Sequence, residues 1–235
     1  MILRRIAEAL RSRDWLTFAI EFGLVVAGVF IGIQVANWNE ARRDAIAESA
    51  MLDRLHEEFT QLEPGLRNWF ELAETSVEST AIVIDALRAE SPPDDEARFR
   101  FALARANWVA TVPEISTTYK ELVATGRLSE LDDAALRNTL TRYGEVHARV
   151  ERVNVSGTAV VFNPLQNYFR AVDWNTDPAS WETDRAIVDY DWELLRASRA
   201  EMQAWIAFQH DLAVFGQEEM DAVREILRLL GERGS

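Results

Sequence analysis

The sequence predicts an all-α protein in which one N-terminal transmembrane helix continues into a helical-bundle extramembrane domain. Residues 22–38 form a run without a charged side chain, and apolar character extends back to Trp15 with only Glu21 interrupting it. Further along the chain, apolar residues recur at three- and four-residue steps, which is the period of amphipathic helices, and strand-like alternation is sparse. We divide the chain into a short cytoplasmic segment 1–14, a transmembrane helix 15–38 and an acidic helical extramembrane domain 39–235.

The apolar segment is long enough to cross a bilayer. At about 1.5 Å per residue, Trp15–Trp38 covers roughly 36 Å, against a hydrocarbon core of about 30 Å. Trp15 and Trp38 stand at its two ends, where amphipathic rings prefer the headgroup layer. Asn37, Asn39 and Glu40 follow as polar anchors at the outer interface. The alternative is that residues 37–40, Asn-Trp-Asn-Glu, form a docking site for a loop of a partner protein.

Arginines on either side of the apolar run indicate its orientation. Four of them precede the run and two follow it closely: Arg4, Arg5, Arg11 and Arg13, then Arg42 and Arg43. Because Lys and Arg resist translocation, we expect a cytoplasmic N-terminus and a C-terminal domain in the periplasm or outside the cell. The charge bias is modest, so the inverted orientation stays open. A cleaved signal is a further alternative, but for cleavage after Ala36 the residue two positions earlier should be small, and it is Gln34.

The domain after the anchor is acidic and rich in apolar residues. The chain has a net charge of −14, and residues 39–235 hold 21 basic and 36 acidic side chains together with six of the eight tryptophans. Such apolar content argues against a disordered acidic tail. The negative charge repels nucleic acids and anionic headgroups. The absence of cysteine excludes disulfides, thiolate zinc sites and cysteine nucleophiles.

The first half of the domain reads as helices separated by clear breaks. Apolar residues from Leu52 to Trp69 recur at helical spacing, so the membrane helix continues outward, with Pro64 expected to kink or restart it. This stretch reaches about Glu90. Residues 91–95, Ser-Pro-Pro-Asp-Asp, then break the helix and begin a new one that runs to about Trp108.

The second half is also expected to be helical. The predicted elements are a short helix Ile115–Thr125 closed by Gly126, a long helix capped by Asp132 or Asp133, a loop Asp173–Asp184, and a final helix from about Tyr190 to Leu230 with a bend at Gly216. Residues Val153–Phe162 are the strongest candidate for β structure. We favour a helix that continues there towards Pro164.

Two segments resemble an uncharacterised family of bacterial single-pass membrane proteins. Residues Glu21–Arg43, EFGLVVAGVFIGIQVANWNEARR, match its N-terminal signature, an apolar run that ends in a Gln-x-x-Asn-Trp-Asn-Glu box. Residues Thr117–Leu140, TTYKELVATGRLSELDDAALRNTL, are similar to its second block, in which Tyr-x-Glu-Leu precedes a Gly and a Leu-Arg pair. Ala36 departs from the pattern, because a second Asn is common there. The family is a domain of unknown function, so the resemblance implies a bacterial inner-membrane architecture and no activity.

One face of the predicted transmembrane helix carries small residues and a carboxyl group. At 100° per residue, Glu21, Gly28 and Gly32 fall within about 20° of one line. Spacing of the type Gly-x-x-x-Gly lets a second helix approach closely, and an intramembrane carboxyl should find a partner. The expected helix–helix interface consists of Glu21, Val25, Gly28, Gly32 and Ala36. The alternative for Glu21 is that it lies near the cytoplasmic interface and reaches water.

The sequence contains no recognisable catalytic, cofactor or metal site. His56, His147 and His210 lack the spacing of metal ligands, and adjacent acidic pairs read as solvated surfaces or helix caps. No phosphate-binding glycine loop and no Gly-x-Ser-x-Gly elbow is present. Trp174 and Trp181 could line a pocket, although aromatic residues beside a helical core usually serve packing.

These observations favour a membrane-anchored, non-catalytic interaction subunit. It would serve as an accessory, assembly or scaffolding component of a larger membrane complex or of a homo-oligomer, acting through the Glu21/Gly28/Gly32 face and the helical domain. The expected partners are the bilayer and another integral membrane protein or a second copy of the chain. We expect no nucleic acid, no cofactor and no small-molecule ligand. The alternative is a ligand-sensing helical domain that signals laterally through a membrane partner, and an enzyme ranks third.

Overall fold

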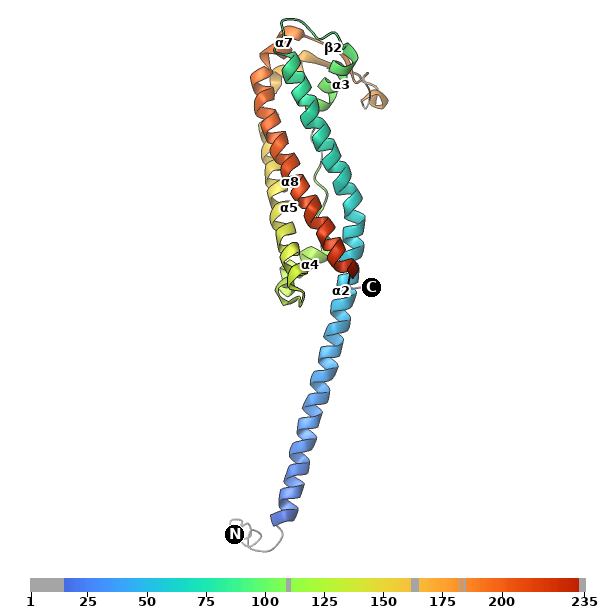
Figure 1. Ribbon diagram of the computed structural model, residues 1–235, viewed down its shortest axis with the longest axis vertical. Coiled ribbons are helices and arrows are strands. Elements are labelled where there is room, and N and C mark those ends of the chain that lie inside the picture. Colours follow the sequence, from blue (N-terminus) through green and yellow to red (C-terminus); the bar gives the residue numbers. More distant parts are fainter. Residues whose placement is uncertain (1–14, 109–110, 162–164, 182, 184, 233–235) are drawn as a thin grey trace. The chain divides into compact units, whose positions relative to one another are not determined.

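The computed structural model describes residues 15–108, 111–161, 165–181, 183 and 185–232 (Figure 1). The predicted cytoplasmic segment 1–14 lies outside these residues. The chain separates into two compact units, Met1–Leu52 and Asp53–Ser235. Within the described residues, helices predominate and the strands form a single two-stranded sheet, which confirms the all-α prediction.

Helix α2, Trp15–Ala86, contains the apolar run. Residues 18–47 of α2, in the N-terminal unit, are all exposed, with Phe18 71% and Val29 59% exposed. Of the helices in the described part of the chain, only α2 is long and apolar enough to cross a membrane, and none of its most apolar window is buried.

Of the two outcomes predicted at Pro64, a kink or a restart of the helix, the structure excludes the restart. Helix α2 passes through Pro64 without a break in its helical assignment. Proline lacks an amide proton, so the Thr60 carbonyl loses its partner four residues on, which costs about 3 kcal/mol in a helix interior. Beyond it, Leu66 and Trp69 are 0% and 3% exposed. Burying two such side chains contributes about 1.5–3 kcal/mol each, which is enough to keep the helix continuous.

The C-terminal unit is built on three long helices. Residues 53–86 of α2 and helix α5, Ala134–Val161, run in the same direction, and α8, Arg199–Glu232, runs back (Figure 1). Asp133 caps α5, because its Oδ1 accepts hydrogen bonds from the amides of Ala135 at 2.8 Å and Leu136 at 3.0 Å. Of the two residues predicted to cap this helix, Asp132 and Asp133, it is therefore Asp133 that does so. Residues 153–161 are helical as favoured, and Phe162 lies outside the described residues.

The core of the bundle is apolar with aromatic rings at its centre. Phe59 on α2 and Tyr143 on α5 meet edge to face with ring centroids 5.0 Å apart, and Tyr119 meets Tyr143 at 5.3 Å. All three residues are buried. Edge-to-face pairs of this kind add about 0.5–1.5 kcal/mol to the free energy gained from burial.

Two shorter helices follow the predicted signals. Helix α3, Glu96–Ala106, begins after Asp95, whose side chain accepts from the Arg98 amide. Helix α4, Thr117–Thr125, ends at Gly126, which has a φ of 76°. Such a left-handed cap favours glycine, as predicted. A 3-10 turn, η1, Arg127–Glu130, then leads towards α5.

One end of the unit carries a small sheet that the sequence analysis missed. Strand β1, Val172–Trp174, pairs antiparallel with β2, Ile187–Tyr190, after helix α6, Gln166–Ala171. The predicted loop 173–184 thus begins as a strand and includes the 3-10 turn η2, Pro178–Ser180; Glu182 and Asp184 lie outside the described residues. Arg100 on α3 donates hydrogen bonds to the carbonyl oxygens of Ile187 and Val188, which supports β2 from its other side.

The predicted final helix is divided in two. Helix α7, Trp192–Ala197, is capped by Asp191, and α8 begins after Ser198. Ser198 is fully buried, and both its amide and its hydroxyl donate to the Leu195 carbonyl, at 2.9 and 2.7 Å, where α7 ends. Helix α8 continues through Gly216, which is buried against the ring of Trp69.

Candidate functional site

The residues predicted to form a helix–helix interface lie on the exposed first part of α2. Glu21, Val25, Gly28, Gly32 and Ala36 are all exposed, and a Cβ added at either glycine would meet nothing within 4 Å. Because the helix is continuous, its geometry keeps them along one side. The membrane-interface anchors Trp15, Asn37, Trp38, Asn39 and Glu40 are likewise exposed.

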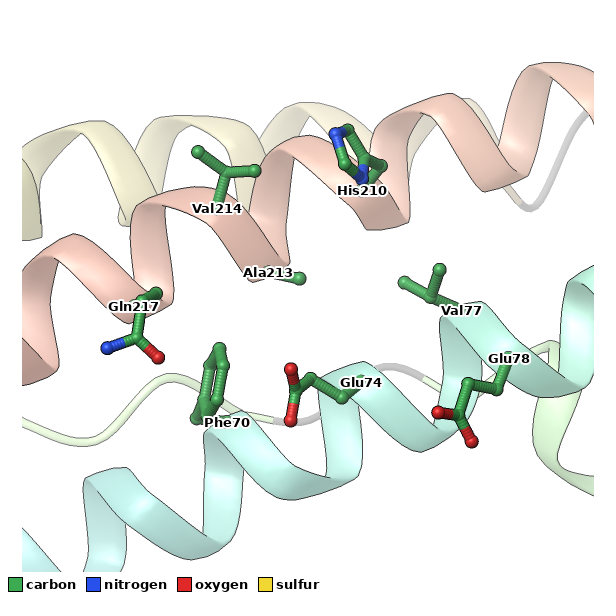
Figure 2. A pocket seen from close by; sticks show the side chains of 8 residues that line it. All are labelled: Phe70, Glu74, Val77, Glu78, His210, Ala213, Val214 and Gln217. Atoms are coloured by element: carbon green, nitrogen blue, oxygen red, sulfur yellow. The ribbon is translucent and has the colours of Figure 1, made fainter.

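A second candidate surface, not foreseen from the sequence, is a groove between α2 and α8 in the C-terminal unit. It encloses about 310 Å³ and is lined by four residues from each helix: Phe70, Glu74, Val77 and Glu78, and His210, Ala213, Val214 and Gln217. Figure 2 shows Phe70, Glu74 and Val77 directed from α2 towards α8, with Ala213 and Gln217 directed back. We call this surface the α2–α8 groove.

Two contacts hold α2 and α8 together beside this groove. At one, the Trp69 ring lies against Gly216, where an added Cβ would stand 2.5 Å from Trp69 Cζ3. At the other, Gln209 Nε2 donates to Ser76 Oγ at 2.5 Å. The two contacts are seven residues apart on each helix, and their order along α8 is the reverse of their order along α2. They therefore fix one antiparallel register, and the groove occupies the neighbouring face.

The second contact is part of a buried polar network around the end of α3. The Ala106 carbonyl accepts hydrogen bonds from Thr80 Oγ1 at 2.9 Å, Trp205 Nε1 at 2.7 Å and Gln209 Nε2 at 2.8 Å. Ser76 Oγ donates to the Arg105 carbonyl at 3.0 Å. Carbonyl groups at a helix C-terminus lack partners within the helix, so these side chains supply them. The network makes the α2–α8 contact specific in position.

The walls of the groove are acidic or neutral. No Lys or Arg stands in residues 68–87 or 200–223, which include both walls. Within the described residues, Glu74 and Glu78 form no salt bridge, and both are exposed. By contrast, Glu63 and Asp85, which flank the groove on α2, pair with Arg67 and Arg88. The groove thus carries two exposed carboxylates without a cationic partner among the described residues.

A buried ion pair joins α5 to α8. His147 Nδ1 lies 2.7 Å from Glu219 Oε1, and the two side chains are 5% and 2% exposed. Burial alone would lower the pKa of His147, but the hydrogen bond and charge of Glu219 overcome it and raise the pKa. Glu151, 3.6 Å away, acts in the same direction. This histidine therefore has a structural partner and is not a free base.

Glu58 ties α2 to the start of α4. Its carboxylate accepts from Ser116 Oγ at 2.7 Å and from both the amide and the hydroxyl of Thr118, at 2.9 and 2.7 Å. Burial acts to raise the pKa of Glu58, and these hydrogen bonds lower it overall. An anion at a helix N-terminus also satisfies amides that lack intrahelical partners. Thr118 belongs to the second block of the suggested family resemblance.

The remaining candidates are dispersed. His56 lies on α2, His147 is held by Glu219, and His210 borders the groove. Across the part of the chain that the structure describes, no three His, Cys, Asp or Glu side chains are placed to hold a metal ion together. Trp181 donates to the Asn175 carbonyl at 2.7 Å and is half exposed, so it stabilises its own loop.

No protein-family model matches this chain. Neither a curated protein nor a solved structure matches it. The function is therefore inferred from the residues and their geometry alone.

Proposed function

We propose that this protein is a membrane-anchored, non-catalytic interaction subunit of a larger membrane complex or of its own oligomer. Its single span lies in the inner membrane of a bacterium, with the N-terminus in the cytoplasm and the helical domain on the other side. The span associates with a second helix through Glu21, Val25, Gly28, Gly32 and Ala36. The observation that carries the proposal is the exposure of this whole face on an apolar helix.

A bare face of this composition is poorly suited to lipid alone. Gly28 and Gly32 leave a shallow furrow that acyl chains fill less well than a close-packed helix. Glu21 on the same side carries a carboxyl group whose transfer into hydrocarbon is costly without a partner. A second helix against this face satisfies both requirements at once.

Replacing Gly28 and Gly32 by Leu tests the association. The larger side chains hold the backbones apart and remove close contact, while the segment stays apolar enough to insert. We expect cross-linking in native membranes to lose its specific products. The matched control is Gly23→Leu, because Gly23 lies about 140° from Gly28 and about 180° from Gly32 around the helix and is equally open. Unchanged cross-links in the Gly28/Gly32 variant would contradict the proposal.

The orientation is tested separately. A reporter that is active only in the periplasm should be active when fused after Ser235, and a cytoplasmic reporter should not. Substituting Arg4, Arg5, Arg11 and Arg13 together should weaken this preference, since the charge asymmetry depends on them. An active cytoplasmic reporter on the wild-type chain would reverse the topology.

A further inference from the structure

The α2–α8 groove has the shape of a docking site for one helical segment. From Phe70 to Glu78 the α2 wall covers about 12 Å, or two helical turns. A helix that lies in a groove of this length contacts it through side chains at positions i, i+3, i+4 and i+7. The volume of about 310 Å³ is sufficient for several such side chains.

The apolar part of the groove is exposed in the chain alone. Val214 is 41% exposed, and Phe70, Val77 and Ala213 are half-buried. All four line the groove, and in Figure 2 Phe70, Val77 and Ala213 lie between the two helices while Val214 stands at its rim on α8. Covering them removes apolar surface from water, which is the main source of affinity at protein interfaces.

The groove is held open in a fixed form. The Trp69–Gly216 contact and the Ser76–Gln209 hydrogen bond hold both walls in one register. Trp69 and Gln209 are each 3% exposed, so neither is free to move aside. A preformed site avoids the entropic cost of ordering its walls when a ligand binds.

The charge of the walls selects the occupant. Glu74 and Glu78 are one helical turn apart and form no salt bridge within the described residues, and no Lys or Arg lies on either wall. A cationic side chain placed beside either turn gains a carboxylate partner. A second copy of this chain, with a net charge of −14, is electrostatically disfavoured, as is an anionic membrane surface.

We propose that the α2–α8 groove binds a cationic amphipathic helix of a partner protein. Its apolar side chains cover Phe70, Val77 and Val214, and its Lys or Arg residues pair with Glu74 and Glu78. The inference rests on the proposed function, because it assigns the helical domain a partner of its own. It concerns a surface separate from the Gly28/Gly32 face, so each can fail without the other.

The test uses the full chain in nanodiscs of zwitterionic lipid. The probe is a fluorescent peptide of about 15 residues, with Leu at i, i+3, i+4 and i+7 and Lys on the flanking positions. Fluorescence anisotropy measures its binding, with empty nanodiscs as the blank. We expect binding that weakens with salt, and no binding of the same peptide with Glu in place of Lys.

Two variants of the groove separate its charge from its apolar lining. The double variant Glu74→Gln/Glu78→Gln should bind the Lys peptide at least about tenfold more weakly, and Val214→Asn should also weaken it. The control Glu130→Gln/Asp132→Asn removes the same charge from exposed sites near η1 and should change binding less than about twofold. Helical circular dichroism confirms that each variant is folded.

Several results would overturn the proposal. An equal loss in the control variant, or full binding by Val214→Asn, would show unspecific attraction to an acidic surface. Complete displacement by an equal concentration of spermidine would assign the groove to a small polyamine. Self-association in sedimentation that Val214→Asn abolishes would assign it to a second copy. None of these results would change the cross-links that report on Gly28 and Gly32, so the proposed function is judged independently.

Discussion

Removing His147 should destabilise the helical domain strongly, because Glu219 would remain buried without a partner. The pair is 2.7 Å apart, and its side chains are 5% and 2% exposed. Loss of one member of such a pair typically costs about 3–5 kcal/mol, since the remaining charge cannot reach water. We expect this loss for His147→Ala. With a urea m-value of about 3 kcal/mol/M, the unfolding midpoint should fall by about 1 M or more.

Variants that keep or remove both partners provide the comparison. Glu219→Gln retains the shape and a hydrogen bond to His147, so its cost should be only about 1–2 kcal/mol. The double variant His147→Leu/Glu219→Met removes both polar groups and should recover most of the loss. Circular dichroism of the full chain in mild detergent follows unfolding in urea. A loss below about 1 kcal/mol for His147→Ala, or a double variant as unstable as the single one, would refute the reasoning.

The same pair predicts a pH dependence. Burial opposes the shift, but Glu219 and Glu151 raise the pKa of His147 in the folded state. A raised folded pKa contributes stability that is fully present below the ordinary value of about 6.5. That stability is lost as pH rises through the folded pKa. The wild-type domain should therefore be less stable at about pH 9 than at about pH 6, and Glu219→Gln should show a smaller difference.

Three further predictions concern other contacts, each measured by unfolding in urea. Glu58→Gln should cost about 1–3 kcal/mol in the free energy of unfolding. Burial acts to raise the pKa of Glu58, but hydrogen bonds such as those from Thr118 outweigh it and lower the pKa in the folded state. The stability that Glu58 contributes is therefore present above the unfolded pKa of about 4.3 and is lost as pH falls through the folded pKa. A stability that does not change on acidification would count against it. Gly157→Ala places a Cβ 1.7 Å from Phe208 Cζ and should cost about 1–3 kcal/mol, but much less in a Phe208→Ala background. Pro64→Ala should stabilise the exposed helix position by about 1–3 kcal/mol, and a loss would show that proline is required there.

Local signals in the sequence were sufficient for most of the helices. Asp95, Asp133 and Gly126 act within a few residues of themselves, so their roles as caps can be read from the chain. The restart predicted at Pro64 does not occur, for the opposite reason. Its local cost is real, but it is offset by burial of Leu66 and other residues against distant helices.

The sheet and the groove depend on contacts that no local pattern contains. Strand β1 has only three residues and pairs with β2. Strand β2 is in turn held by Arg100, which donates a hydrogen bond to the carbonyl of Ile187, 87 residues further along the chain. Glu74 and His210 line the same groove only because α8 folds back along α2. One signal was available: the absence of Lys and Arg from residues 68–87 and 200–223. It indicates two acidic surfaces, but does not place them side by side.

The equal spacing of the two contacts between α2 and α8 limits how the chain length can vary. Inserting or deleting one residue between Trp69 and Ser76 rotates everything beyond it by about 100°. The Trp69–Gly216 contact could then be kept only if the hydrogen bond between Ser76 and Gln209 were lost. The same holds on α8 between Gln209 and Gly216. Length changes should therefore be tolerated in the exposed turn at residues 89–92, which makes neither contact, and should be rejected within these two seven-residue intervals.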